Sequence, residues 1–284
     1  MSDLRPDQSL MACLDNVRRM DHDRYLTALL APDAARGKLI ALYALNAEIA
    51  RVREMVSEPM LGQIRLQWWR EAVEGIAAGE VRGHEAAVAL NEAFGADINV
   101  AGVTALIDAR ERDLDDEPFA DMAALREYCA GTSSGLMRLA ALALSPTDAP
   151  DAEATIRDAG IAYALTGLLR ALPLHASQGR LYLPLDLLGA HNVDPHTIFA
   201  GEMSEGLRAI MQVVADEARK HLTAARATPK MPRVLLAALL PASLCDAYLD
   251  QMTTTGFDPF RVAVDVPVFR QQLRLLGRKF VGRI

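Results

Sequence analysis

The chain has few aromatic residues, no paired cysteines and no long apolar run. Aromatic residues make up only 5% of it. Its cysteines, Cys13, Cys129 and Cys245, lie far apart and form no Cys-x-x-Cys pair, so the sequence suggests neither a zinc site nor a disulfide framework and fits a reducing compartment. Residues 234–240, the longest apolar run, fall well short of the ~20 residues that cross a bilayer. We therefore expect a cytoplasmic protein, either soluble or held peripherally at the inner face of the membrane.

An excess of positive charge is also lacking. The 30 Lys and Arg residues stand against 37 Asp and Glu residues, a formal net charge of -7. Nucleic-acid binding needs a basic footprint, so a general nucleic-acid binder is excluded. The charge is uneven, however, because no acidic residue occurs from Val266 to the end of the chain. The basic residues of this segment are Arg270, Arg274, Arg278, Lys279 and Arg283.

Alanine and leucine are abundant and are spaced as in helices. From residue 34 to residue 56, for example, apolar side chains recur every three or four positions. Caps and prolines, such as Asn99, Ser204 and Pro59, predict where helices begin. No internal repeat or linker marks a boundary, so we expect an all-α fold in one domain, residues 1–284. The main helices are predicted at residues 34–56, 59–76, 100–114, 122–144, 152–172, 205–222, 234–240 and from 268 onward.

Five phrases carry a resemblance to a known family. They occur in the same order and spacing as in that family, within residues 23–195, and their sequences are LIALYAL (39–45), LQWWR (66–70), LID to DL (106–114), LTGLLR (165–170) and GRLYLP (179–184). The chain resembles the squalene and phytoene synthase family. The resemblance implies an isoprenoid (terpenoid) synthase fold, in which a single all-α domain surrounds a deep central apolar cavity.

In active members of this family, two aspartate-rich motifs on facing helices hold Mg²⁺ ions that bind prenyl diphosphates. Such ions require hard oxygen ligands, usually carboxylates. The resemblance places the first motif on residues 50–54, where Ala50, Arg51 and Glu54 share one helical face. Only Glu54 is acidic. The arginines of this motif would repel a divalent cation.

The second motif falls on residues 171–175, and it has also lost its aspartates. Ala171 and His175 occupy its first and last positions, and Gly167 stands one turn earlier where an asparagine is usual. Imidazole is a poor replacement for a carboxylate on Mg²⁺. The resemblance further implies that Ala50, Arg51, Ala171 and His175 face one another across a cavity.

Loss of both metal clamps predicts a non-catalytic protein with no metal and no cofactor. A metal ion that binds the departing phosphate lowers the activation free energy by several kcal/mol, and each ~1.4 kcal/mol changes the rate tenfold. Two alternatives remain open. One is a prenyltransferase that condenses prenyl diphosphates at an unusual site, for which Mg²⁺ would be the cofactor. The other is a carrier that shelters an isoprenoid or lipid tail in the residual cavity.

Within the family, the chain resembles the branch that contains mitochondrial complex I assembly factor 6. The matching phrases lie in residues 47–58, 127–134 and 169–177. That branch is associated with maturation of the respiratory NADH dehydrogenase. The resemblance therefore implies an assembly role with a respiratory complex I subunit as partner.

Arginines near both motifs are candidates for binding an anion without metal, because guanidinium pairs bidentately with phosphate and carboxylate. The alternative is that they form ordinary salt bridges with Glu48, Glu54 or Glu58. The full candidate ligand set is Tyr43, Arg51, Arg53, Tyr128, Arg170 and Arg180.

A row of small residues follows one face of the helix predicted at 152–172. It either leaves a channel for a prenyl or acyl tail or lets helices pack closely. The row consists of Gly160, Ala164, Gly167 and Ala171.

Residues 266–284 are predicted to form a basic amphipathic helix. Phe269, Leu273, Leu276 and Phe280 recur at spacings of four, three and four, with basic residues between them. Such helices lie on anionic membrane surfaces. The alternative is that the apolar stripe packs on the helical core and the arginines cover it.

Overall fold

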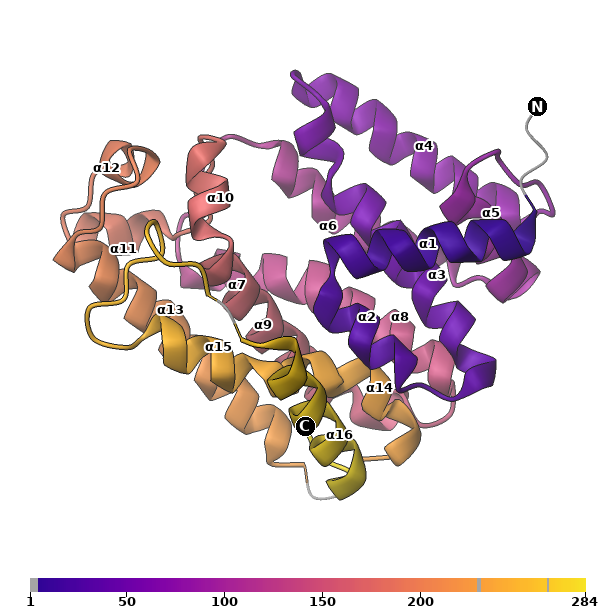
Figure 1. Ribbon diagram of the computed structural model, residues 1–284. Helices are drawn as coiled ribbons and strands as arrows, with labels where there is room; N and C mark the ends of the chain where they lie inside the picture. The colour runs from indigo at the N-terminus through magenta and orange to yellow at the C-terminus, as the bar shows by residue number, and fades with distance from the viewer. Residues whose placement is uncertain (1–4, 229–230, 265) are drawn as a thin grey trace. The chain divides into compact units, whose positions relative to one another are not determined.

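The computed structural model describes residues 5–228, 231–264 and 266–284, and these residues form helices joined by loops (Figure 1). No β-strand occurs among them, which confirms the all-α prediction. The α-helices are α1 (Pro6–Met20), α2 (His22–Leu29), α3 (Asp33–Ala50), α4 (Pro59–Ala77), α5 (Glu85–Phe94), α6 (Val100–Glu111), α7 (Met122–Cys129), α8 (Gly135–Leu144), α9 (Glu153–Arg170), α10 (Leu172–Ser177), α11 (Leu185–Ala190), α12 (Pro195–Phe199), α13 (Glu205–Arg226), α14 (Leu236–Leu239), α15 (Cys245–Met252) and α16 (Val268–Val281).

The chain divides into two compact units, each assembled from three separate stretches. The first unit comprises Met1–Asp115, Gly135–Glu153 and Met231–Pro241, and the second comprises Asp116–Ser134, Ala154–Lys230 and Ala242–Ile284. Neither unit is one continuous segment of the chain. The assignment of residues 1–284 to a single domain stays a prediction.

Helix α3 forms the centre of the first unit. Ten of its residues are buried, including the whole run from Leu39 to Ala47, so it is apolar around most of its circumference. A helix of this kind must be covered on several sides. Helices α1, α5 and α8 pack against it, and α4 packs against α6.

In the second unit, α13 is the longest helix and has one buried face. Ser204 caps it, since the hydroxyl accepts a hydrogen bond from the Leu207 N–H at 3.0 Å. Helices α11 and α15 pack against α13. The apolar residues of α13 that become buried are Leu207, Ile210, Met211, Val214, Ala215, Ala218, Leu222 and Ala225.

Several predicted helices are interrupted in the structure. The helix predicted at 34–56 ends at Ala50 and continues as a 3-10 helix, Val52–Met55. The helix predicted at 122–144 contains a π-helix at Ala130–Ser134, where the Thr132 hydroxyl donates to the carbonyl of Tyr128 at 2.7 Å. Such back-bonding by Ser and Thr distorts helices.

The helix predicted at 152–172 breaks at Ala171, between α9 and α10. Pro173 explains the break, because proline lacks an N–H and its ring clashes with the carbonyl four residues earlier. Pro173 instead lies in the first turn of α10, where it is tolerated.

The stretch Arg233–Met252 has the length and hydropathy of a membrane span. However, 72% of its most apolar window is buried inside the structure. Core helices of globular proteins have the same composition, so the stretch is weak evidence for a membrane segment.

The C-terminal helix is present as α16, and of the two arrangements considered for its apolar stripe, packing on the core is not the one observed. The stripe formed by Phe269, Leu273, Leu276 and Phe280 does not pack on the core, since these side chains are between 51% and 85% exposed. The buried residues of α16 are Gln271 and Leu275. Hydrogen bonds from Gln271 to Tyr248 and from Arg274 to Asp246 hold the helix in this orientation.

Candidate functional site

The first motif lies where α3 ends. Ala50 is the last residue of the helix, Arg51 follows it, and Glu54 belongs to the 3-10 helix. The Arg51 Nε lies 3.9 Å from the Glu54 Oε2, so the two side chains form an ion pair. Of the two interpretations for Arg51, an anion ligand or an ordinary salt bridge, the structure contains the salt bridge.

The neighbouring charged residues make other contacts. The Arg53 guanidinium donates to the carbonyl of Val56 at 3.3 Å. Glu48 accepts a hydrogen bond from the amide of Asn16 at 3.0 Å, and its other oxygen lies 3.9 Å from the His84 Nε2. The predicted salt bridge of an arginine with Glu48 is therefore not among the contacts described for Glu48.

Tyr43 lies in α3, about two turns before the first motif. It is buried, with only 1% of the residue exposed. Burial raises the pKa of its hydroxyl strongly, and the nearby positive charge of Arg24 lowers it in part. The Arg24 guanidinium carbon lies 5.8 Å from the ring centre of Tyr43. The hydroxyl has no hydrogen-bond partner within the described part of the chain.

Sequence reasoning missed the charged residues next to Tyr43. Arg24 is buried and donates to the Asp21 carboxylate at 2.5 Å, while Asp21 also caps α2 by accepting from the Arg24 N–H at 3.1 Å. Asp23 is buried as well. Asp directly before an apolar helical stretch is an N-cap signal, and Asp21 would have located this helix start.

In the second unit, two glycines of the small-residue row on α9 have different surroundings. A Cβ atom on Gly160 would come within 2.4 Å of the Ser134 Cα, so this glycine allows two segments to pack closely. A Cβ atom on Gly167 would meet no described atom within 4 Å. The close-packing interpretation therefore holds at Gly160, and open space is found at Gly167.

His175 and Tyr128, two of the predicted site residues, belong to one group of rings. We call Phe119, Tyr128, His175 and Tyr182 the aromatic cluster. The ring centres of His175 and Tyr182 are 4.5 Å apart, and those of Tyr128 and Tyr182 are 5.8 Å apart. Phe119 lies 5.1 Å from Tyr128. Sequence reasoning did not select Phe119 or Tyr182, although Tyr182 lies within the GRLYLP phrase.

The two remaining candidate arginines lie at the ends of α9 and α10. The guanidinium carbon of Arg170 lies 3.7 Å from the ring centre of Tyr248, which is a cation–π contact. Arg180 follows α10 and is half-buried, and its backbone N–H donates to the carbonyl of His175 at 2.8 Å. Arg170 thus contacts an aromatic ring within its own unit.

The residues at the motif positions do not fit Mg²⁺. Ala50, Gly167 and Ala171 have no side-chain oxygen, and Arg51 is a cation paired with the only carboxylate left, Glu54. Over the described ranges, no three His, Cys, Asp or Glu side chains gather as a metal site requires. The two motifs belong to different units, and their arrangement across a shared cavity stays a prediction.

Sequence comparison identifies the family. The squalene/phytoene synthase family model matches residues 17–277, and the chain belongs to this family. The NADH dehydrogenase (ubiquinone) complex I, assembly factor 6 of Bos taurus is 30% identical over 250 residues, covering 87% of this chain and 75% of that protein. The 15-cis-phytoene synthase of Synechococcus elongatus is 28% identical over 268 residues, covering 87% and 84%.

Solved structures agree with the fold. A dehydrosqualene synthase in complex with ligand has a TM-score of 0.76 at 18% identity, covering 97% of each chain. A squalene synthase from Alicyclobacillus acidocaldarius has a TM-score of 0.66 at 16% identity, covering 98% of this chain and 95% of that one. These likenesses confirm the predicted helical fold alone.

Proposed function

We propose that the protein is a non-catalytic member of the squalene/phytoene synthase family that serves in the assembly or maturation of respiratory complex I. The observation that carries this proposal is the chemistry of the motif positions. Ala50 and Ala171 offer no ligand atom, and Arg51 brings a positive charge where a divalent cation would bind. The pairing of Arg51 with Glu54 supports the same conclusion.

Overall similarity does not decide between the two kinds of relative. The bovine assembly factor is 30% identical to this chain and the cyanobacterial phytoene synthase 28%, over comparable lengths. Function is carried by the site rather than by the fold. The replaced residues at positions 50, 51 and 171 therefore favour the assembly role over prenyl transfer.

The experiment that tests this proposal is complementation in the organism that encodes the chain. Deletion of the gene is expected to lower the NADH:quinone oxidoreductase activity of its membranes and to leave succinate:quinone activity unchanged. Wild-type protein and the variant Glu54→Ala are both expected to restore the activity, because no step of the proposed role uses this carboxylate.

Two outcomes would count against the proposal. One is normal complex I activity after deletion. The other is a Glu54→Ala variant that is folded and as abundant as wild type yet fails to complement, since Glu54 is the only acidic residue left at the motif positions.

A carrier of an isoprenoid or lipid tail is a second candidate, favoured by the open space at Gly167. Native mass spectrometry of the purified protein tests it, with a co-purified lipid as the expected result. Gly167→Leu is expected to reduce the amount of that lipid. Gly189→Leu on α11 is the matched control, because a Cβ atom there also meets no described atom within 4 Å and the position is exposed. A lipid retained equally by both variants would contradict this candidate.

A further inference from the structure

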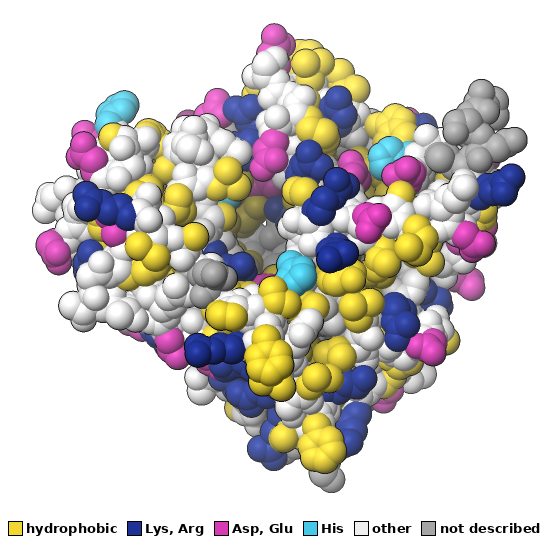
Figure 2. Space-filling model, viewed as in Figure 1, with side chains coloured by type: hydrophobic (Ala, Val, Ile, Leu, Met, Phe, Trp, Pro, Cys, Tyr) yellow, Lys and Arg dark blue, Asp and Glu magenta, His cyan; other side chains and the backbone are white. Residues whose placement is uncertain are grey.

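Helix α16 turns its most apolar side away from the rest of its unit. We call this side the outer face, and it consists of Phe269, Leu273, Leu276 and Phe280. Each of these side chains is more than half exposed, and Phe280 is 85% exposed. Figure 2 shows hydrophobic side chains next to Lys and Arg side chains in the region where Figure 1 places α16.

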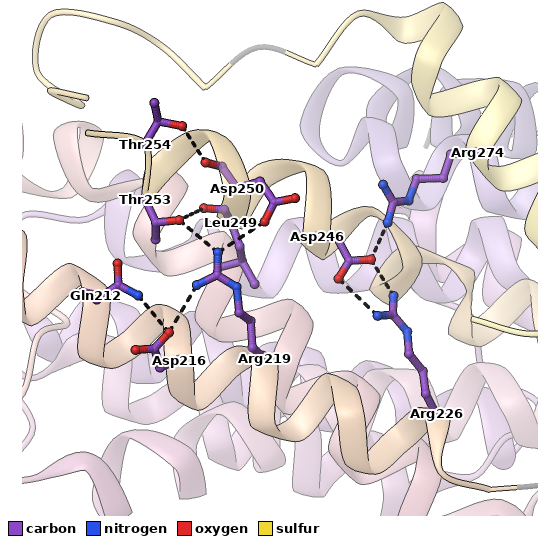
Figure 3. Close-up of polar contacts among 10 residues, drawn as sticks. All are labelled: Gln212, Asp216, Arg219, Arg226, Asp246, Leu249, Asp250, Thr253, Thr254 and Arg274. Carbon is purple, nitrogen blue, oxygen red and sulfur yellow. Dashed lines mark hydrogen bonds and ion pairs between the residues drawn. The ribbon is translucent and has the colours of Figure 1, made fainter. Parts of the chain in front are cut away.

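The opposite side of α16, which we call the inner face, is held by polar contacts. The amide of Gln271 donates to the Tyr248 hydroxyl at 3.1 Å and to the carbonyl of Val266 at 2.9 Å. Arg274 donates to the carboxylate of Asp246 on α15 (Figure 3). The inner face consists of Gln271, Arg274, Leu275 and Arg278.

This arrangement reverses the usual one, in which a surface helix turns its apolar side toward the core. Exposed apolar patches on soluble proteins mark interaction sites. The contacts of the inner face already hold the helix on its unit. The outer face can therefore bind an apolar surface while α16 stays in place.

The charges around α16 are mostly positive. The Asp246 carboxylate accepts hydrogen bonds from both Arg226 and Arg274, so one negative charge is shared by two cations. Burial and the charges of Arg226 and Arg274 lower the pKa of Arg278, as expected where cations gather. Arg270 and Lys279 lie at opposite edges of the outer face, one turn or more from its centre.

We propose that α16 is a membrane-binding helix that lies in the plane of a bilayer containing anionic phospholipid. Its outer face enters the interface between head groups and acyl chains, and Arg270 and Lys279 reach the phosphates at either edge. A helix of 14 residues is about 21 Å long, which is too short to span the apolar layer but sufficient to lie on it.

Charge favours this occupant over a second copy of the chain. Two outer faces packed together would bring Arg270 and Lys279 of one copy close to the same residues of the other, and like charges repel. An anionic bilayer attracts both residues. The inference is independent of the assembly role proposed above.

The test is co-sedimentation of the intact protein with vesicles of phosphatidylcholine, alone or with about 30% phosphatidylglycerol, at low and high salt. Wild-type protein is expected to bind the anionic vesicles at low salt, to bind neutral vesicles far less, and to dissociate at high salt. The variant with Phe269, Leu273, Leu276 and Phe280 changed to Ser is expected to bind at least about tenfold more weakly.

A matched control removes exposed apolar side chains from another helix. Met60, Leu61 and Ile64 of α4 are also exposed, and a variant with all three changed to Ser is expected to bind like wild type. Circular dichroism checks that both variants are folded. The double variant Arg270→Gln and Lys279→Gln is expected to lose the preference for anionic vesicles.

A fluorescent probe reports insertion directly. Because Cys13, Cys129 and Cys245 are buried, an environment-sensitive dye on the variant Leu273→Cys labels α16 selectively, and its emission is expected to shift to the blue on anionic vesicles.

Three results would overturn the proposal. The first is no binding of wild-type protein to anionic vesicles, and the second is equal binding by the α16 serine variant. The third is a wild-type dimer in sedimentation velocity that becomes monomeric in the serine variant, which would assign the outer face to self-association.

Discussion

Arg51, which follows the last residue of α3, lies one turn from Glu54 in the next 3-10 helix, with 3.9 Å between the Arg51 Nε and the Glu54 Oε2. This ion pair joins Arg51 to Glu54, the one carboxylate among residues 50–54, where the family resemblance places the first metal-binding motif. An anionic ligand would have to compete with Glu54 for Arg51, and a metal ion would have to displace Arg51 from Glu54. The local contact thus opposes both kinds of ligand.

The ion pairs of α15 predict two different effects of similar substitutions (Figure 3). The Asp246 carboxylate is bound by Arg226 at 2.7 Å and also by Arg274, and is 27% exposed, whereas the Asp250 carboxylate is bound by Arg219 at 3.3 Å and is 74% exposed. We expect Asp246→Asn to lower the free energy of unfolding by about 2 kcal/mol at pH 7. Asp250→Asn is the control, with a loss of about 0.5 kcal/mol or less. Urea unfolding measures both, and equal losses would contradict the account.

The Asp246 effect should also depend on pH. Burial by itself raises the pKa of Asp246, but the hydrogen bond from Arg226 and the charges of Arg226, Arg274 and Arg278 lower it overall below its ordinary value of 3.8. A depressed carboxylate pKa contributes stability above the unfolded-state pKa, and this contribution is lost as the pH falls through the folded-state pKa. The difference between wild type and Asp246→Asn should therefore be full at pH 6 and shrink below about pH 4. A difference that stays constant down to pH 3 would refute this.

Two glycines of α9 should respond oppositely to the same change. At Gly160 a Cβ atom would lie 2.4 Å from the backbone of Ser134, so Gly160→Ala should destabilise the protein by about 1–3 kcal/mol. At Gly167 a Cβ atom meets no described atom within 4 Å, so Gly167→Ala should stabilise it by about 0.5–1 kcal/mol through helix propensity. Thermal unfolding of both variants measures these two changes in stability. A loss of stability in Gly167→Ala would show that the space at this position is filled.

The hydroxyl groups of two buried tyrosines predict a further contrast. The Tyr248 hydroxyl accepts a hydrogen bond from the Gln271 amide at 3.1 Å, and we expect Tyr248→Phe to cost about 1 kcal/mol. The Tyr43 hydroxyl has no partner among the described residues, so Tyr43→Phe should leave the free energy of unfolding unchanged or raise it by up to about 1 kcal/mol. A clear loss in Tyr43→Phe would mean that this hydroxyl binds a ligand or an ordered water.

Much of the fold could be predicted because the signals were local. The caps Asn99 and Ser204 mark the first turns of α6 and α13, as their hydrogen bonds to the Gly102 and Leu207 N–H groups confirm. The break at Ala171 had a local signal in Pro173 that was not used. The π-helix at Ala130–Ser134 had only a weak local signal in Thr132, whose hydroxyl bonds the carbonyl of Tyr128, because most Ser and Thr residues inside helices cause no such change.

The candidate site and α16 show where sequence reasoning ends. Family phrases selected Tyr128 and His175, but only the structure places Tyr182 between their rings. The spacing in α16 correctly predicted which residues share a face. It did not predict which face packs, because the partner of Arg274 is Asp246, 28 positions earlier, and nothing in the local pattern indicates that pairing.

The central claim is that the chain has the fold of a prenyl-condensing enzyme without its metal-dependent chemistry. The most direct measurement is Mg²⁺-dependent release of pyrophosphate from farnesyl and geranylgeranyl diphosphate by purified protein, with products identified by mass spectrometry. The account predicts no release above that of a protein-free control and no condensed product. Robust Mg²⁺-dependent release by wild type, together with its loss in Glu54→Ala, would contradict it.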